Sequence, residues 1–453
     1  MSRKFRDWAP SQSLLFPPSP QDWLVENHLV YFLLDVSEAV DLSPLLGDYD
    51  SDQGGQPPFH PRMMLVLLLY SYCVGVFSSR KIAERCQTDV AFRVIVGEDI
   101  PDFRTISGFR RRHLKHVQHL FVEVLRLCRE AGLLKVGRLA LDGTKVKANA
   151  SRHKAMSYDR MTTEEQRLEG EIKTLLDEAQ STDDAEDAEY GAQQRGDALP
   201  EELARRERRL EKIRQAKAAL EERARTQATE EAAARAAEGR PAPKVDPQDA
   251  VPDPKDQYNF TDPESRIMKT SNKGWDQCGN AQAVANEAQI IVAADVTDQA
   301  NDSRQVQPMV EQTVENLDAV GVAENVAAFT ADAGYYSEEN VAVLDQNDRI
   351  QESYLATGRL KHHEQVPEAP RGRPPQDLTA KEKMARKLRT KRGRKEYARR
   401  KAIIEPVFGQ TKQCRGFRQF LLRGLQKMKS EWKLVCLTHN LGKLFRNAAQ
   451  AGN

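Results

Sequence analysis

Two aspartates in the sequence follow apolar segments and lie close to a glycine. Asp142 directly precedes Gly143, and Asp332 lies two residues before Gly334. A carboxylate at the carboxyl end of a strand in an open α/β sheet points into the crevice where such sheets bind ligands. Two such strand ends side by side could share a divalent cation, because Mg²⁺ prefers hard oxygen ligands. Since Asp-Gly is also a common turn dipeptide, a simple turn is the alternative for either aspartate taken singly.

A third carboxylate, Glu405, lies in the otherwise basic C-terminal third of the chain. Its neighbours at positions 403, 404, 407 and 408 are apolar, and burying an isolated glutamate there is costly unless it is paired or bound to a metal. The alternative is a glutamate neutralised by neighbouring Arg and Lys side chains. Lys412 follows seven residues later, so on a continuous helix the two side chains would face the same way, about 10 Å apart. Pro406 predicts a kink or a new helix start between them.

Two further aspartates compete for a place in such a site. Asp295 follows an apolar segment but lacks an adjacent glycine, so it is the substitute if one of the three carboxylates is wrong. Asp302 precedes Ser303 and a periodic apolar pattern, which favours a helix-capping role.

The elements that would position these carboxylates form a mixed α/β pattern. We predict a helix at 302–320 from its apolar face. The remaining segments have strand character, and together with this helix they predict a mixed sheet; they are 137–143, 281–287, 289–296, 325–330 and 352–356.

The region before the first strand is predicted to be helical. An apolar helix at 62–77 is followed by a short amphipathic helix at 80–86 and a basic helix running from 101 to about 130. Short helices with tight polar turns and basic residues on one face suit a helix-turn-helix-like DNA-binding module. A purely structural helical bundle is the alternative.

Charge is segregated along the chain. The 453 residues include 68 Lys and Arg and 67 Asp and Glu, yet residues 159–240 hold 22 acidic and 15 basic residues, and residues 381–446 hold 21 basic and 4 acidic ones. The acidic segment predicts a charged helical hairpin with a loose tip at 181–200 and a Pro-rich linker at 241–254. A solvated spacer is its plain interpretation. We also hypothesise that it limits non-specific DNA binding by repelling phosphates, since local field steers polyanions.

Several classes of protein are not expected. We do not expect secretion, because the sequence shows no basic leader followed by an apolar segment. We do not expect a membrane span either, because the longest apolar run, 63–77, has 15 residues, short of the roughly 18–20 that span a bilayer. The six cysteines show no paired spacing, so we expect reduced thiols in a cytoplasmic protein without a membrane partner.

At the three carboxylates the sequence resembles the DDE transposases of bacterial insertion sequences. The resemblance rests on the run 142–144, on the run 331–335, and on Glu405 followed by Lys412. Residues 59–113 resemble the N-terminal helical domain of these enzymes, and residues 415–432 resemble their C-terminal segment. The similarity extends over most of the chain, from about residue 20 to 446.

The resemblance implies a ribonuclease-H-like mixed-sheet α/β catalytic core, an N-terminal all-helical, helix-turn-helix-like domain, and a helical insertion. The expected division has five parts: a helical DNA-binding domain at 1–135, the first part of the core at 136–158, the acidic hairpin and linker at 159–255, the remaining core with basic C-terminal helices at 256–446, and a tail at 447–453.

The resemblance also implies the chemistry and the partners. Asp142, Asp332 and Glu405 would be the catalytic, metal-holding residues for Mg²⁺, with Mn²⁺ as a substitute, in two-metal-ion cleavage of insertion-sequence ends and transfer of the 3′-hydroxyl ends to target DNA. The expected partners are the terminal inverted repeats, target DNA and a second copy of the chain in a synaptic homodimer. The enzyme would be cytoplasmic, and associated with the nucleoid when bound to DNA.

One branch of the family carries the signature Y-x2-R-x3-E-x6-K, which this sequence fits at its ends. Its arginine role stays open, because one basic residue lies five positions before Glu405 and the next lies four before it. The basic stretch would bind phosphates largely without regard to base sequence. The expected DNA-contact residues are Tyr397, Arg400, Lys401, Lys412, Arg415, Arg418, Arg110, Arg111 and Arg112.

Two other functions remain open from the sequence. A DNA nuclease on the same core would cut without joining strands. A domesticated transposase with an idle metal site would act as a DNA-binding regulator.

Overall fold

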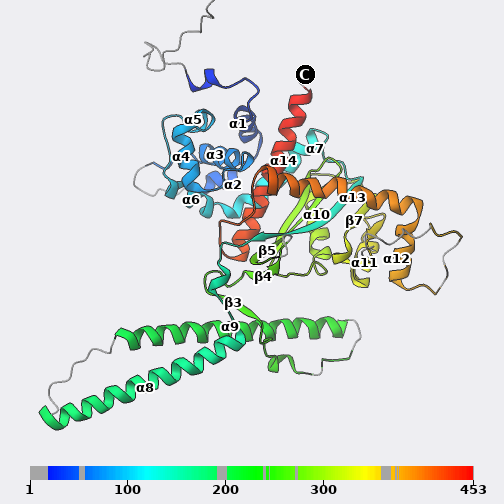
Figure 1. The fold of residues 1–453 in the computed structure, drawn as a ribbon. Helices are drawn as coiled ribbons and strands as arrows, with labels where there is room; N and C mark the ends of the chain where they lie inside the picture. Colours follow the sequence, from blue (N-terminus) through cyan, green and yellow to red (C-terminus); the bar gives the residue numbers. More distant parts are fainter. Residues whose placement is uncertain are drawn as a thin grey trace, which may run out of the picture.

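The computed structural model describes residues 19–49, 57–190, 201–237, 241–243, 245–270, 274–358, 369–372, 375 and 377–451. Figure 1 shows a helical N-terminal region, a mixed sheet with its helices, and a long helical hairpin. None of the helices in this described part of the chain combines the length and the apolar composition that a bilayer span requires.

The N-terminal region is helical, as predicted. The apolar helix α3 is buried from Met64 to Tyr72 and forms its centre. The expected long basic helix is interrupted, however, because His113 and His116 both bond to Oδ2 of Asp48, at 3.0 and 2.8 Å, and fix a 3₁₀ turn between two helices. The helices of this region are α1 (Leu29–Ala39), α2 (Ser43–Leu46), α3 (Pro61–Cys73), α4 (Ser79–Thr88), α5 (Val90–Val96), α6 (Phe103–Arg112) and α7 (Val117–Glu130).

The main sheet is mixed, as predicted, and β1 (Arg138–Lys147) lies near its centre. On one side β1 pairs with antiparallel β5 (Trp275–Asn286), whose other edge pairs with β4 (Arg266–Lys269) and then β6 (Ile291–Thr297). On its other side β1 is parallel to β7 (Ala328–Ala331), which is parallel to β8 (Ser353–Leu355). Of these strands, β4 was not predicted.

Helices from the second half of the chain cover this sheet. The predicted helix at 302–320 is the shorter α10 (Val306–Ala319), and α14 (Leu425–Ala451) continues into the segment expected to be a tail. In Figure 1, α14 passes between the helical region and the sheet, and it contacts α3, α7 and β6. The other helices are α11 (Glu338–Asp345), α12 (Ala380–Arg389) and α13 (Lys391–Gly409).

The acidic segment forms the predicted helical hairpin, of α8 (Tyr158–Tyr190) and α9 (Glu201–Ala237). Its base is closed by a two-stranded sheet of β2 (Ala155–Ser157) and β3 (Gln257–Asn259). The part of the expected loose tip before residue 191 is helical, and residues 191–200 lie outside the described residues. The hairpin has a small apolar core of its own, formed by Met161, Leu168, Leu210, Ile213, Ala216 and Leu220.

Candidate active site

The sheet register brings the first two predicted carboxylates together. Leu141 of β1 pairs with Ala331 of β7 in parallel register, so the residues that follow them, Asp142 and Asp332, occupy adjacent positions. The expected strand end at Asp142 is wrong, because β1 continues to Lys147 in antiparallel pairing with β5. Asp332 ends its strand and caps the following 3₁₀ turn, where its Oδ1 accepts a hydrogen bond from the amide of Gly334 at 2.8 Å. Asp142 is mostly buried, and its Oδ1 accepts from the amide of Gly143 at 2.8 Å.

Arg400 of α13 pairs with the first of these carboxylates. Its Nη1 donates to Oδ2 of Asp142 at 2.8 Å, and its side chain is only 10% exposed. Burial raises the pKa of Asp142 above its ordinary value, and the guanidinium of Arg400 opposes that rise. Helix α13 is held against the sheet by a second ion pair, between Arg138 of β1 and Glu396.

Glu405 lies on the same helix but is more exposed. Its carboxylate is 4.0 Å from Nη2 of Arg400, and its side chain is 54% exposed, so Glu405 does not carry the cost of a buried charge. Of the two outcomes expected at Pro406, a new helix start is not found, because α13 runs through it to Gly409. A proline frees the carbonyl four residues earlier, and here that carbonyl, of Ala402, accepts from Nε2 of Gln289 at 3.1 Å.

Lys412 contacts the strand that carries Asp142. It lies in a π-helical turn at 410–414, and its Nζ donates to the hydroxyl of Thr144 at 2.5 Å and to the carbonyl of Lys145 at 2.8 Å. Burial lowers the pKa of Lys412 from its ordinary value. Its ammonium group therefore supports the end of β1 next to the carboxylates.

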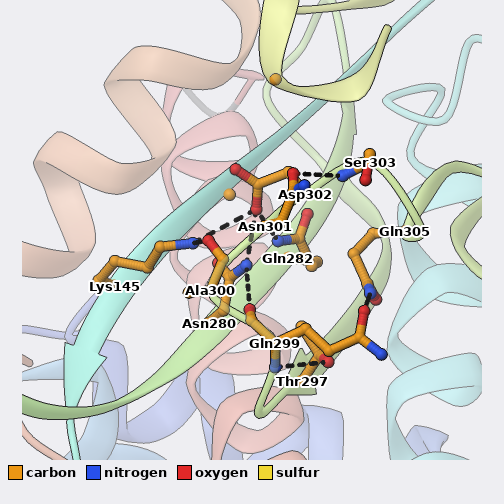
Figure 2. A network of polar contacts seen from close by, with 12 residues as sticks. Lys145, Asn280, Gln282, Thr297, Gln299, Ala300, Asn301, Asp302, Ser303 and Gln305 are labelled. Carbon is orange, nitrogen blue, oxygen red and sulfur yellow. Dashed lines mark hydrogen bonds and ion pairs between the residues drawn. The ribbon is translucent and has the colours of Figure 1, made fainter. Parts of the chain in front are cut away.

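Asp302 is not the helix cap that the sequence suggested. Helix α10 begins after Gln305, without a side-chain cap. Figure 2 shows Asp302 within a network of polar side chains instead, where its Oδ1 accepts from Nδ2 of Asn280 at 2.6 Å, from Nε2 of Gln282 at 2.9 Å and from Nζ of Lys145 at 3.4 Å. Gln282 in turn accepts a hydrogen bond from the hydroxyl of Tyr335.

This network lies against the two glycines of the aspartate motifs. A Cβ on Gly143 would lie 2.5 Å from Nε2 of Gln282 and 3.1 Å from Oδ1 of Asp302. A Cβ on Gly334 would lie 3.1 Å from Oδ1 of Asp332 and 3.5 Å from Oδ2 of Asp302. The glycines therefore leave the space into which these polar groups fit.

The network is the part of the site that the sequence reasoning missed. Asn280 and Gln282 are fully buried, and they alternate along a strand that is otherwise apolar at its centre. Alternate residues of a strand share one face. Two buried polar residues at that spacing are the signal that could have pointed to a polar partner such as Asp302.

Asp295, the expected substitute, lies elsewhere. Its Oδ2 is ion-paired with Nζ of Lys429 on α14 at 2.8 Å, and its register partner on β5 is Gln282. It has no contact with Asp142 or Asp332 among those the structure describes.

The predicted DNA-contact residues differ in how far they are exposed. Arg110 is buried and donates to the hydroxyl of Tyr72 at 3.1 Å and the carbonyl of Phe77 at 3.0 Å, and Arg415 donates to the carbonyl of Val435 at 3.0 Å. Their guanidinium groups are bonded to groups inside the protein, so they are not placed for the DNA contact that the sequence suggested. Tyr397 is half-buried, with Arg400 lying 5.8 Å from its ring centre. The exposed members of the predicted set are Arg111, Arg112, Lys401 and Arg418.

The donor set suits a hard divalent cation. Asp142 offers its carboxylate from the middle of β1, next to the end of β7, where Asp332 offers another. Asp302 lies close to Asp332, and Glu405 lies on the other side of Arg400 from Asp142. Mg²⁺ and Mn²⁺ take such oxygen ligands, whereas soft metals favour thiolates. The described cysteines are free, and none has a contact with these carboxylates.

Comparison with protein families decides the affiliation. Residues 19–112 match the model described as Transposase domain (DUF772), and residues 374–445 match the model described as Transposase DDE domain. The two matches support a DDE transposase of an insertion-sequence family. No curated protein and no solved structure matches it.

The two matched segments fit the structure of this transposase. The first covers α1 to α6, and the second covers α12, α13 and most of α14, including Glu405 and Lys412. Asp142, Asp332 and Asp302 lie between the matched segments. The affiliation implies that the transposase binds DNA and acts with divalent metal ions, as its family generally does.

Proposed function

We propose that this transposase cleaves the ends of its insertion sequence and transfers the resulting 3′-hydroxyl ends to target DNA. Asp142, Asp332 and Glu405 would hold Mg²⁺, with Mn²⁺ as a substitute, on a ribonuclease-H-like core. The observation that carries the proposal is the parallel register of β1 and β7, which supports a shared cation between Asp142 and Asp332. A homodimer would bring two ends together.

The proposed chemistry divides between the cations and the side chains. Divalent cations held by Asp142, Asp332 and Glu405 would supply positive charge to the attacking and leaving oxygens of an in-line displacement. Asp142 and Asp332 supply fixed negative charge for them, because each carboxylate is oriented by a backbone amide, of Gly143 and of Gly334 respectively. No protein nucleophile is needed.

Arg400 has a distinct role in this proposal. It is bonded to Asp142 and lies 4.0 Å from Glu405, so its charge offsets both carboxylates while no cation is held. Its positive charge opposes the effect of burial on the pKa of Asp142 and so favours the ionised form that a cation requires. We expect the main role of Arg400 to be its interaction with the two carboxylates, and contact with DNA phosphate to be secondary.

The exposed basic residues would hold the phosphate backbone. Lys401 follows Arg400 on α13, Arg418 lies beyond the π-helical turn, and Arg111 and Arg112 end α6. Such contacts fix the position of DNA without reading its sequence and are weakened by salt. Lys412 would support β1 instead, because its ammonium group is already bonded to Thr144.

The test is a Mg²⁺-dependent cleavage and strand-transfer assay on DNA carrying the terminal inverted repeats of the element. We expect Asp142→Asn, Asp332→Asn and Glu405→Gln each to abolish both products. We expect Asp295→Asn to keep them, because Asp295 is paired with Lys429 and has no contact with Asp142 or Asp332 among those the structure describes. Cleavage by any of the first three variants at the wild-type rate would overturn the assignment. Cleavage without joining by the wild-type protein would favour a nuclease.

A further inference from the structure

We propose that Asp302 is a fourth carboxylate of the cation site, one that holds a divalent ion together with Asp332. This inference rests on the proposed function, because it adds a residue to the same site. Asp302 comes from the segment between β6 and α10 and is 25% exposed.

The orientation of the Asp302 carboxylate supports this role. Its Oδ1 takes hydrogen bonds from Asn280 and Gln282 and an ion pair from Lys145, which fix the group from three directions. Its Oδ2 lies 3.5 Å from the point where a Cβ of Gly334 would be, and Oδ1 of Asp332 lies 3.1 Å from that same point. The two carboxylates therefore approach each other across a glycine.

A buried acceptor next to Asp302 has no partner. Asn280 is fully buried, and its amide nitrogen donates to Asp302 and to the carbonyl of Gln299, but its Oδ1 has no hydrogen bond within the described structure. A buried polar atom without a partner is unfavourable unless a water or an ion satisfies it. A hydrated cation beside Asp302 would supply that partner.

The same network also fixes the turn that carries Asp332. Tyr335, in that turn, donates its hydroxyl to Gln282, which donates to Asp302. Tyr335 is buried, and the pKa of its hydroxyl is raised well above the ordinary value, first by burial and then by Asp302, Asp142 and Asp332. The hydroxyl of Tyr335 thus links the turn that carries Asp332 to Gln282 and, through it, to Asp302.

Lys145 offers a test, because the proposal predicts that removing its charge and removing the charge of Asp302 change the cation affinity in opposite directions. Its Nζ lies 3.4 Å from Oδ1 of Asp302 and donates to the carbonyl of Ala300 at 2.8 Å. If Asp302 contributes charge to a cation, removing its charge weakens cation binding, and removing the charge of Lys145 strengthens it. If the pair serves only to hold the fold, both changes act in the same direction.

The experiment measures Mn²⁺ binding to the full-length protein by the electron paramagnetic resonance signal of free Mn²⁺. We expect Asp302→Asn to raise the dissociation constant about tenfold, since it removes one negative charge near a divalent ion, and Lys145→Gln to lower it. Asp298→Asn is the matched control, because Asp298 lies in the same segment but is paired with Arg266 at 2.7 Å. Circular dichroism of each variant checks the fold.

The outcomes separate the two proposals. Wild-type binding by Asp302→Asn, equal weakening by Asp302→Asn and Asp298→Asn, or weakening by Lys145→Gln would each overturn the role of Asp302. Asp142→Asn is measured alongside: if it weakens binding while Asp302→Asn does not, only the further inference fails. If Asp142→Asn also leaves Mn²⁺ binding unchanged, the proposed metal site itself fails.

Discussion

Gly143 is the position where one added methyl group would disturb the site most directly. Its Cβ would lie 2.5 Å from Nε2 of Gln282, 3.0 Å from the hydroxyl of Tyr335 and 3.1 Å from Oδ1 of Asp302. All three groups are fixed by bonds to each other, so none can give way without breaking the network. Gly143→Ala therefore forces the polar groups apart or bends β1.

The expected loss of stability follows from two opposing effects. Overpacking a well-packed site by a methylene costs about 1–3 kcal/mol. Replacing glycine by alanine within a strand regains roughly 0.5–1 kcal/mol of backbone entropy. We therefore expect Gly143→Ala to lower the free energy of unfolding by up to about 2.5 kcal/mol. Displacement of Asp142 and Tyr335 should cost far more in activity, on the order of 10²-fold for a shift of 1 Å.

Gly137→Ala is the matched control, because the only neighbour of its Cβ among the described residues would be Oε2 of Glu287, at an ordinary 3.5 Å. Urea unfolding followed by circular dichroism gives the stability of both variants, and the strand-transfer assay gives their activity. We expect Gly137→Ala to match the wild type in both. If Gly143→Ala were as stable and as active as Gly137→Ala, the close packing of the network around β1 would be refuted.

Two further predictions concern buried charges. Arg400→Gln should move the acid limb of the pH–rate profile to higher pH, because Arg400 lowers the pKa of Asp142 and without it the ionised carboxylate forms only at higher pH; an unchanged limb would contradict this. Glu431→Ala should lower the free energy of unfolding by about 3–5 kcal/mol in urea titrations. Glu431 is fully buried and accepts hydrogen bonds from Tyr72 and two backbone amides near Arg110, and Glu431→Gln should lower the free energy of unfolding less than Glu431→Ala does.

The neighbourhood of Asp142 and Asp332 could be predicted because it depends on local pattern. Each follows an apolar run near a glycine, and parallel neighbouring strands bring such positions together, although only Asp332 lies at a strand end and β1 continues to Lys147. The register of Leu141 with Ala331 confirms that neighbourhood. What the pattern could not supply was the exposure of Glu405, since that depends on how α13 lies over the sheet.

The role of Asp302 could not be predicted from its own neighbours. Its position before a helical pattern is typical of a cap, but the donors that fix it come from β1 and β5, with Lys145 more than a hundred residues away in sequence. The amides of Asn280 and Gln282 outcompete the capping interaction because they are buried and need an acceptor. Tertiary partners therefore overrode a local signal.

The predicted DNA-binding arginines show a similar limit. Charge counts treat every arginine alike, whereas the guanidinium groups of Arg110 and Arg415 donate hydrogen bonds to carbonyls and hydroxyls of the interior. Arg110 lies in a run of three arginines, and only its two followers are exposed. The helix period decides this, because a 100° turn per residue sends consecutive side chains to different faces.

The acidic hairpin carries part of the charge that balances the basic C-terminal third, and its structure limits what that charge can do. Many of its carboxylates are paired with its own cations, as Glu165 is with Arg214 at 3.2 Å and Lys217 at 2.9 Å. Figure 1 shows the hairpin extending away from the main sheet. Exposed charges interact weakly beyond a Debye length of about 8 Å at physiological salt. Any repulsion by the hairpin therefore acts on DNA lying along it, whereas the charges that act on Asp142 are those of Arg400 and Asp332.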